Sequence, residues 1–193
     1  MRDYDSAFQP VVSQGKLLLA SNSDDSLRCF DLVSGATVWT FTTGGPIRVA
    51  PTIANGKAYF GSDDGCVYAV EVEDGSLLWK RRLVEADCFV NDGRLCSFQP
   101  VRTGVLLDES RSTLIAGAGV FPWRPSLLCA LQTDSGELAW KQDLGLGYTI
   151  EGPLLLGEEH VVSPQGRARP SCSPEPMASQ WVPWLAVGVH LRC

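Results

Sequence analysis

Three charged residues stand near the starts of predicted short strands, where their side chains could meet and bind a ligand. They are Arg48, Arg102 and Glu151. Guanidinium and carboxylate groups that converge at the ends of neighbouring strands can hold a small anionic ligand or a peptide. The same groups can instead be solvated or can pair with charged neighbours. We therefore name the three residues as a candidate binding set, with both interpretations open.

A stretch with aromatic residues forms a second candidate binding surface. The segment 116–126 reads AGAGVFPWRPS and contains Phe121, Trp123 and Arg124. Its loop is predicted to be about six residues longer than the matching turn GSDDG at 61–65. Aromatic and arginine side chains on a loop of a rigid scaffold are typical of binding surfaces. The alternative is that the loop folds back and covers its own strands.

The segment 82–100, RLVEADCFVNDGRLCSFQP, is a long connection between two repeated units. The letters NDG at 91–93 predict an internal turn. Connections of this length often carry function or are disordered. A disulfide bond between Cys88 and Cys96 would require an oxidising compartment.

The residues that usually carry catalysis or bind metals do not cluster in this sequence. The seven cysteines are all separated, no C-x-x-C pair occurs, and the two histidines are isolated. A calcium site needs about six to eight converging oxygens. The pairs Asp24-Asp25 and Asp63-Asp64 are better interpreted as ordinary turn residues. We expect no catalytic residue, no metal site and no cofactor.

The overall composition argues against several classes of protein. Of the 193 residues, 45% are hydrophobic and 20% are charged, as in a folded domain. The net charge of −6 argues against nucleic acid as a partner. No apolar run reaches the ~18 residues of a membrane span. The start, MRDYDSAFQP, lacks the pattern of a secretory signal peptide.

An internal repeat predicts the elements that position these residues. Three segments share one pattern: CFDLVSGATVW (29–39), AVEVEDGSLLW (69–79) and ALQTDSGELAW (130–140). In each segment a glycine stands four residues before a tryptophan; the pairs are Gly35 and Trp39, Gly75 and Trp79, and Gly136 and Trp140. Such repetition indicates consecutive copies of one supersecondary unit.

Within one unit the apolar residues alternate with a period of two, which predicts strands. In 51–83 we expect strands at PTIA, KAYFGS, CVYAVEV and LLWKRRL, separated by Asn-Gly and Asp-Gly turns that suit tight hairpins. Four short antiparallel strands in about 40 residues form a blade of a β-propeller, so the predicted fold class is all-β. We expect the glycine to permit a tight turn and the tryptophan to cover the joint with a neighbouring blade.

The pattern D-x-x-[ST]-G-x-x-x-W, most complete in DLVSGATVW, resembles the repeats of pyrroloquinoline-quinone-like (PQQ-like) β-propellers. The resemblance covers roughly residues 8–170. It implies a propeller that closes with about eight blades, of which this chain would supply about three and a half. For the enzymes of this family it also implies adjacent cysteines above the quinone, a calcium ion and an aspartate base. None of these can be assigned to a position in this sequence.

The repeat predicts two regions. Residues 1–163 form a partial propeller, with blades at about 8–39, 48–79 and 101–140 and the start of a fourth at 151–163. Residues 164–193 form a proline-rich tail without the repeat signature. Two explanations of this tail stay open. It is a disordered or divergent segment, or the reading frame is lost near Arg169.

The predicted function is a non-enzymatic module that binds a ligand or a protein as a scaffold, in a fragment of a larger bacterial propeller. The resemblance implies this role for members of the outer-membrane assembly lipoprotein type. The alternative is a fragment of a PQQ-dependent oxidoreductase whose catalytic residues lie outside this chain. We also expect self-association through unclosed blade edges. The resemblance suggests a periplasmic or other extracytoplasmic location.

Overall fold

The computed structural model describes residues 9–85, 87–91, 93–156, 160–163 and 185–186. These residues form strands joined by turns and loops, and they include no helix. Accordingly, no helix in these ranges has the length and apolarity that crossing a bilayer requires. The prediction of an all-β fold is confirmed.

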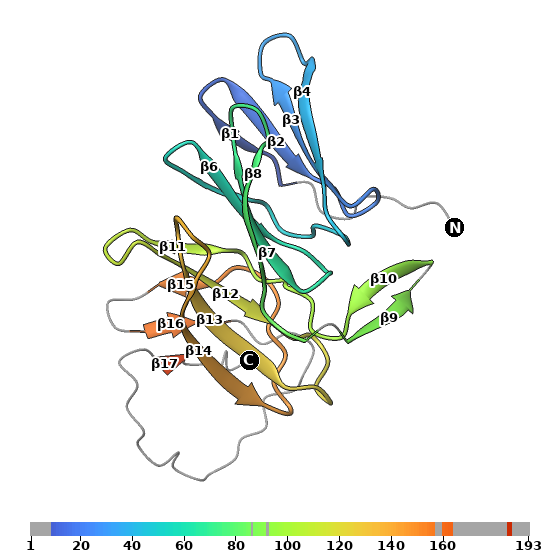
Figure 1. Cartoon of the computed structure of the whole chain (residues 1–193), viewed down its shortest axis with the longest axis vertical. Coiled ribbons are helices and arrows are strands. Elements are labelled where there is room, and N and C mark those ends of the chain that lie inside the picture. The colour runs from blue at the N-terminus through green and yellow to red at the C-terminus, as the bar shows by residue number, and fades with distance from the viewer. Residues whose placement is uncertain (1–8, 86, 92, 157–159, 164–184, 187–193) are drawn as a thin grey trace, which may run out of the picture.

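Three four-stranded antiparallel sheets follow one another along the chain, and in each the sequential strands pair (Figure 1). The first sheet contains β1 (Val11–Ser13), β2 (Lys16–Ala20), β3 (Ser26–Asp31) and β4 (Thr37–Thr42). The second contains β5 (Thr52–Ala54), β6 (Lys57–Gly61), β7 (Cys66–Glu71) and β8 (Leu77–Arg82). The third contains β11 (Leu106–Asp108), β12 (Thr113–Ala118), β13 (Ser126–Gln132) and β14 (Leu138–Gly145).

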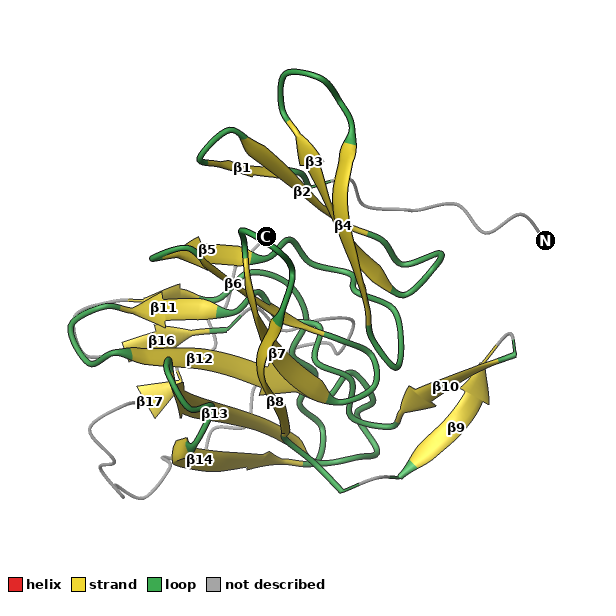
Figure 2. Ribbon diagram, turned by 45° about the horizontal axis from the view of Figure 1, so that its top comes forward, coloured by secondary structure: helices red, strands yellow, loops and turns green. Residues whose placement is uncertain are grey.

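Two smaller sheets complete the described strands. The hairpin of β9 (Cys88–Asn91) and β10 (Arg94–Ser97) projects from the connection between the second and third sheets (Figure 2). The partial fourth sheet pairs β15 (Leu155–Leu156) with β16 (His160–Val162), and β17 (Leu185–Ala186) adds to β16 in parallel.

The second sheet shows why these residues form a meander. Its four strands lie where the alternating apolar pattern predicts them. Asn55 and Gly56 have φ values of 51° and 77°, the left-handed conformations that a tight two-residue turn requires. Each outermost strand continues past its tryptophan, so the sheets span 11–42, 52–82 and 106–145 and extend beyond the predicted blade ends at 39, 79 and 140.

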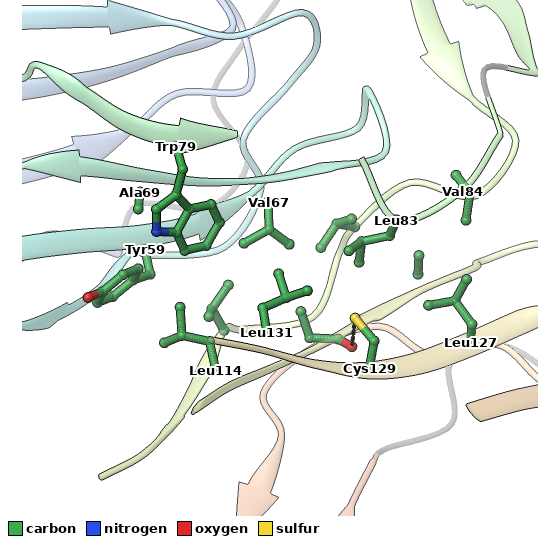
Figure 3. Packing of buried hydrophobic residues seen from close by; sticks show 14 residues of the cluster. Tyr59, Val67, Ala69, Trp79, Leu83, Val84, Leu114, Leu127, Cys129 and Leu131 are labelled. Carbon is green, nitrogen blue, oxygen red and sulfur yellow. Dashed lines mark hydrogen bonds between the residues drawn. The ribbon is translucent and has the colours of Figure 1, made fainter. Parts of the chain in front are cut away.

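Buried apolar residues lie between successive sheets and not in one central core. The first interface joins Leu18 and Leu27 of the first sheet to Phe60 and Tyr68 of the second. The second interface packs Tyr59, Val67 and Trp79 against Leu114, Cys129 and Leu131 (Figure 3). The third joins Ile115 and Leu128 to Leu154 and Val161. Each sheet is therefore one blade of an incomplete propeller.

A tryptophan on the outermost strand of one sheet reaches a turn of the next sheet, and we call this contact the clasp. The indole Nε1 of Trp39 donates a hydrogen bond of 3.0 Å to the carbonyl of Val72. The indole ring lies over Gly75, where a Cβ atom would come within 2.6 Å of it. The glycine therefore does more than permit a turn, because it also makes room for the tryptophan of the preceding repeat.

The clasp recurs one sheet later. Trp79 Nε1 donates to the carbonyl of Thr133 at 2.9 Å, and its ring lies within 2.5 Å of where a Cβ of Gly136 would stand. An ion pair accompanies each clasp: Lys16 with Glu73, and Lys57 with Asp134. The repeat in the sequence thus encodes the contact between sheets as well as the strands within them.

The loop between β12 and β13 is shorter than predicted. Residues 119–125 separate these strands, against 62–65 between β6 and β7, so the loop gains three residues and the prediction of about six is wrong. The difference arises because Gly117 and Ala118 continue the pairing with β13 and belong to the strand.

The disulfide bond considered between Cys88 and Cys96 is not formed. In the hairpin Cys88 pairs with Ser97, and Cys96 pairs with Phe89, so the two cysteines point to opposite faces. All five cysteines that the structure describes are free thiols. Most of the predicted tail, 164–193, lies outside the described residues, and its two explanations stay predictions.

Candidate functional site

Both predicted sets of site residues lie at one end of the sheets, which we call the loop end. In a four-stranded meander, the start of the first strand, the turn between the second and third strands and the end of the fourth strand share one end. Arg48, Arg102 and Glu151 each stand four residues before the first strand of a sheet. The loop 119–125, which holds the aromatic set, joins a second strand to a third.

Arg48, Arg102 and Glu151 line one pocket of about 270 Å³ at the loop end. The remainder of the lining comes from Gln9, Val49, Gly152 and Pro153. The structure therefore brings together three residues that lie far apart in the sequence. It does so because the repeat places them at equivalent positions of consecutive blades.

A buried carboxylate, that of Asp63, holds both arginines of the pocket. Arg102 donates from Nε and Nη2 to its two oxygens at 2.8 and 2.9 Å, and Arg48 donates from Nε at 2.7 Å. The side chain of Asp63 is only 1% exposed. Bidentate pairs of this kind fix the guanidinium plane as well as its charge. The connection before the second sheet, through Arg48, and the connection before the third sheet, through Arg102, therefore bind the same turn of the second sheet.

The charges at this pocket balance. Arg48 and Arg102 face Asp63, and Glu151 lies 3.7 Å from Arg102. Burial alone would lower the pKa of Arg102, but the Asp63 carboxylate raises it above its ordinary value, so the guanidinium stays charged. Because two positive groups meet two negative ones, the pocket has no surplus charge with which to attract a simple anion.

Sequence reasoning assigned Asp63 only to a turn and missed its two ion pairs. The residue does lie in the turn between β6 and β7. Residue type alone does not show whether a turn aspartate is exposed or is buried between two arginines. We call Asp63 with its partners Arg48 and Arg102 the Asp63 hub. The one available signal was the equivalent placement of Arg48 and Arg102 before two strands, which predicts that they could share a neighbour.

The aromatic cluster is the second feature of the loop end, and it consists of Phe89, Phe98, Phe121 and Trp123. The ring centroids of Phe89 and Phe98 lie 4.8 Å apart, and those of Phe121 and Trp123 lie 5.0 Å apart. Phe121 contacts Phe89 edge to face at 5.7 Å. The cluster therefore joins the predicted loop to the β9–β10 hairpin, and Trp123 remains 66% exposed.

Arg124 belongs to this cluster and is not free. Its guanidinium lies 4.5 Å from the centre of the Phe98 ring and forms an ion pair of 2.9 Å with Asp87. A cation above an aromatic face is attracted by the ring quadrupole. The three residues Phe121, Trp123 and Arg124 are thus brought together, whereas no ion pair or ring contact among the described residues joins them to Arg48, Arg102 or Glu151.

The β9–β10 hairpin is held in place at both ends. Arg94 donates to the carbonyl of Asn22 at 2.8 Å and pairs with Asp25 at 3.2 Å, so the hairpin reaches the first sheet. Its other contact is the aromatic cluster on the third sheet. Val90 and Leu95 pair across the hairpin and are 69% and 62% exposed. Because Phe89 pairs with Cys96 on one face of the hairpin, Val90 and Leu95 form an exposed apolar pair on the opposite face.

Of the five cysteines that the structure describes, only Cys88 is exposed. Burial raises the pKa of Cys66 to about 11 and that of Cys129 to about 12, so both thiols stay protonated. Cys29 is fully buried and stands at the repeat position that Ala69 and Ala130 occupy in the other two segments. Within the described ranges, no group of three or more His, Cys, Asp or Glu side chains could hold a metal ion.

Comparison with known proteins gives the family. A family model described as outer membrane protein assembly factor BamB matches residues 5–91. The crystal structure of BamB from Moraxella catarrhalis superposes with a TM-score of 0.58 at 15% identity, over 77% of this chain and 39% of that one. The chain belongs to the PQQ-like β-propeller repeat family.

Curated members of this family differ in what they do. Outer membrane protein assembly factor BamB of Yersinia pestis is 30% identical over 142 residues, which cover 71% of this chain and 33% of that protein. A lanthanide-dependent methanol dehydrogenase of Methylacidiphilum fumariolicum is 34% identical over 56 residues, or 28% of this chain and 9% of that one. The chain thus spans about a third of the BamB proteins that it matches over most of its length.

The arginine pocket does not reproduce the cofactor site that the resemblance implies for quinoprotein enzymes. It supplies two arginines, one carboxylate and one amide. The adjacent cysteines of such a site are missing from the sequence. We therefore derive no chemical step through a quinone at this pocket.

Proposed function

We propose that this chain is a non-enzymatic protein-binding module and that it binds through the aromatic cluster. The observation that carries the proposal is Trp123, which is 66% exposed and packs on Phe121, which in turn contacts Phe89 and Phe98. Large aromatic side chains and arginine dominate the energetics of protein interfaces. Val90 and Leu95 are exposed on the other face of the same hairpin, and this second apolar surface favours a partner with exposed apolar side chains.

The relatives agree with a scaffold role. Several matching proteins are named as assembly factors for outer membrane proteins. We infer that the chain contributes blades to a scaffold for protein assembly outside the cytoplasm. Arg48, Arg102 and Glu151 remain candidate ligand residues in this proposal, but their ion pairs serve first to fix the connections between blades.

A photo-crosslinking experiment tests the binding surface. The chain carries a photoreactive phenylalanine analogue at Val90 in one preparation and at Leu77 in a control, because Leu77 is 49% exposed on β8 of the second sheet. We expect a discrete protein adduct in cells from position 90 and none from position 77. Equal labelling from both positions would contradict the proposal.

Trp123→Ala tests the same surface by affinity. Truncation of a central tryptophan typically costs about 2 kcal/mol of binding, so the adduct from position 90 should decrease by about tenfold or more. The unfolding free energy should change by less than about 0.5 kcal/mol because the side chain is exposed. An undiminished adduct would exclude Trp123 from the interface.

The second candidate function is a fragment of a quinoprotein oxidoreductase, which the match to a methanol dehydrogenase favours. The full chain is mixed with PQQ and with Ca²⁺ or a lanthanide ion, and gel filtration then separates the protein from free quinone. Quinone absorbance that comigrates with the protein would support this function. We expect the quinone to separate from the chain.

A further inference from the structure

One face of the first sheet is not covered by any described residues, although the equivalent face is buried in the second and third sheets. In the second sheet the face turned toward the preceding sheet carries Ala58, Phe60, Tyr68 and Val70, each at most 2% exposed. In the third sheet the equivalent residues are Leu114, Ala116, Cys129 and Leu131, each fully buried. We call this the leading face, and the opposite face the trailing face.

Strand register identifies the same positions in the first sheet. Leu17 pairs with Phe30 and Leu19 pairs with Arg28, as Ala58 pairs with Val70 and Phe60 with Tyr68 in the second sheet. Leu17, Leu19 and Phe30 are only half-buried, and Arg28 is exposed. The leading face of the first sheet therefore has the apolar character of an interface between blades, without a described blade against it.

The clasp provides a second, independent observation at this face. Gly75 and Gly136 each lie under the indole of a preceding tryptophan, whereas a Cβ at the equivalent Gly35 would meet nothing within 4 Å. Leu32 is the equivalent of Val72, whose carbonyl accepts from Trp39. Leu32 is 47% exposed, but Val72 is 2% exposed. Among the described residues, the first sheet thus lacks the contacts that a preceding blade makes at this position in the second and third sheets.

The far end of the described sheets offers the complementary face. In the partial fourth sheet Leu154 and Val161 pack on the third sheet, so the paired residues Leu155 and Val162 point away from it. Leu155 is 63% exposed. Val162 occupies the position that Leu18 holds in the first sheet, where Leu18 packs against the second sheet. The first two strands of this partial sheet therefore present the apolar pair Leu155 and Val162 on the trailing side, the side that covers a leading face between the complete sheets.

We propose that the leading face of the first sheet binds the trailing face of the last sheet of a second copy of this chain. The contact is reciprocal, so two copies related by a twofold axis would leave neither face open. Three complete sheets and one partial sheet from each copy would supply eight blade positions, within the usual range of about four to eight for closed propellers.

One charged residue lies on the face and is compatible with this packing. Arg28 forms an ion pair with Asp24 of the turn before β3. Its equivalents Tyr68 and Cys129 are buried, so closure would bury a charge that keeps its partner and not an isolated one. The aromatic cluster lies at the loop end on other elements, so self-association and the proposed binding function can fail separately.

Light scattering of the full chain over a wide range of concentration tests the proposal. We expect the wild type to approach twice the mass of one chain and to stop there. A double variant, Leu17→Lys with Phe30→Lys, should have the mass of one chain, while the control Val90→Lys, at an exposed apolar residue of the β9–β10 hairpin, should keep the double mass. A wild type that stays single, a mass that grows beyond two copies, or a double variant that still pairs would overturn the proposal.

Crosslinking keeps the proposal testable if the double variant does not fold. In a chain with Cys88, Cys172 and Cys193 replaced by serine, Leu17→Cys and Val162→Cys are made in separate preparations and mixed with a short thiol crosslinker. We expect a covalent pair of chains. Val90→Cys in place of Val162→Cys is the control and should give none. Equal yields from both mixtures would overturn the proposed interface.

Discussion

Asp63 and Asp64 are adjacent in one turn, yet their carboxylates have different partners. Asp63 holds two arginines from the connections between blades. Asp64 accepts hydrogen bonds from the Tyr68 hydroxyl and from the backbone N–H of Cys66, and it pairs with Lys80 at 3.3 Å. Burial alone would raise the pKa of Asp64, but these partners lower it below its ordinary value.

The lowered pKa of Asp64 predicts how stability depends on pH. In the unfolded chain an aspartate carboxyl has a pKa of ~3.9, and the pKa of Asp64 in the folded chain is lower. The ionised carboxylate therefore stabilises the fold fully above the unfolded pKa. This stabilisation is lost as the pH falls through the folded pKa. Asp64→Asn should therefore destabilise the chain by about 1–3 kcal/mol at neutral pH. The difference from wild type should decrease near pH ~3.

Urea unfolding at the two pH values measures this difference. Asp134→Asn is the matched control, because Asp134 is exposed and pairs only with Lys57 in the contacts described above. A penalty for Asp64→Asn that is the same at both pH values would contradict the prediction. The sequence predicted that Asp64 lies in a turn, but its partners could not be predicted because burial and not residue type selects them.

At the scale of the strands and sheets, the clasp is the contact that joins one sheet to the next. The alternation of apolar residues and the Asn-Gly and Asp-Gly turns predicted the strands, since both signals are local. The role of each tryptophan at a joint was also expected. The half of the clasp that was missed is the glycine of the next repeat, because its closeness to Trp39 or Trp79 depends on how two sheets pack.

Conservative replacement of Trp79 should separate the packing of the clasp from its hydrogen bond. Trp79→Phe retains most of the buried ring but loses the donor to the Thr133 carbonyl, so we expect a loss of about 1 kcal/mol. Trp79→Ala also leaves a cavity and should cost about 3–5 kcal/mol. Urea unfolding measures both. Trp123→Phe is the control and should be near neutral, and an equal effect at Trp79 and Trp123 would contradict the role of the clasp.

At the scale of the whole molecule, the Asp63 hub links three blades. Arg48 comes from the connection between the first and second sheets, and Arg102 from the connection between the second and third. The backbone carbonyl of Asp63 also accepts from Ser97 of the hairpin at 2.8 Å. A local repeat predicted the stack of blades. It could not predict this hub, because the hub depends on non-equivalent residues in three different segments.

Asp63→Asn should weaken the coupling between the blades. It leaves two partly buried guanidinium groups without their shared carboxylate, and breaking such pairs typically costs about 3–5 kcal/mol. We expect this loss in urea unfolding, together with a less cooperative thermal transition. Asp134→Asn removes an exposed ion pair and should cost less than about 1 kcal/mol. Similar losses in the two variants would refute the special role of Asp63.

The clasp gives the stack a polarity. In both described cases the indole comes from the earlier sheet and the glycine from the later one, so the two ends of the stack are chemically different. Like ends cannot join through a clasp. A chain with a damaged first sheet but an intact last sheet would therefore still bind one wild-type copy. It would occupy the leading face of that copy and prevent a second wild-type copy from binding there. Such a chain would act as a dominant-negative inhibitor of assembly.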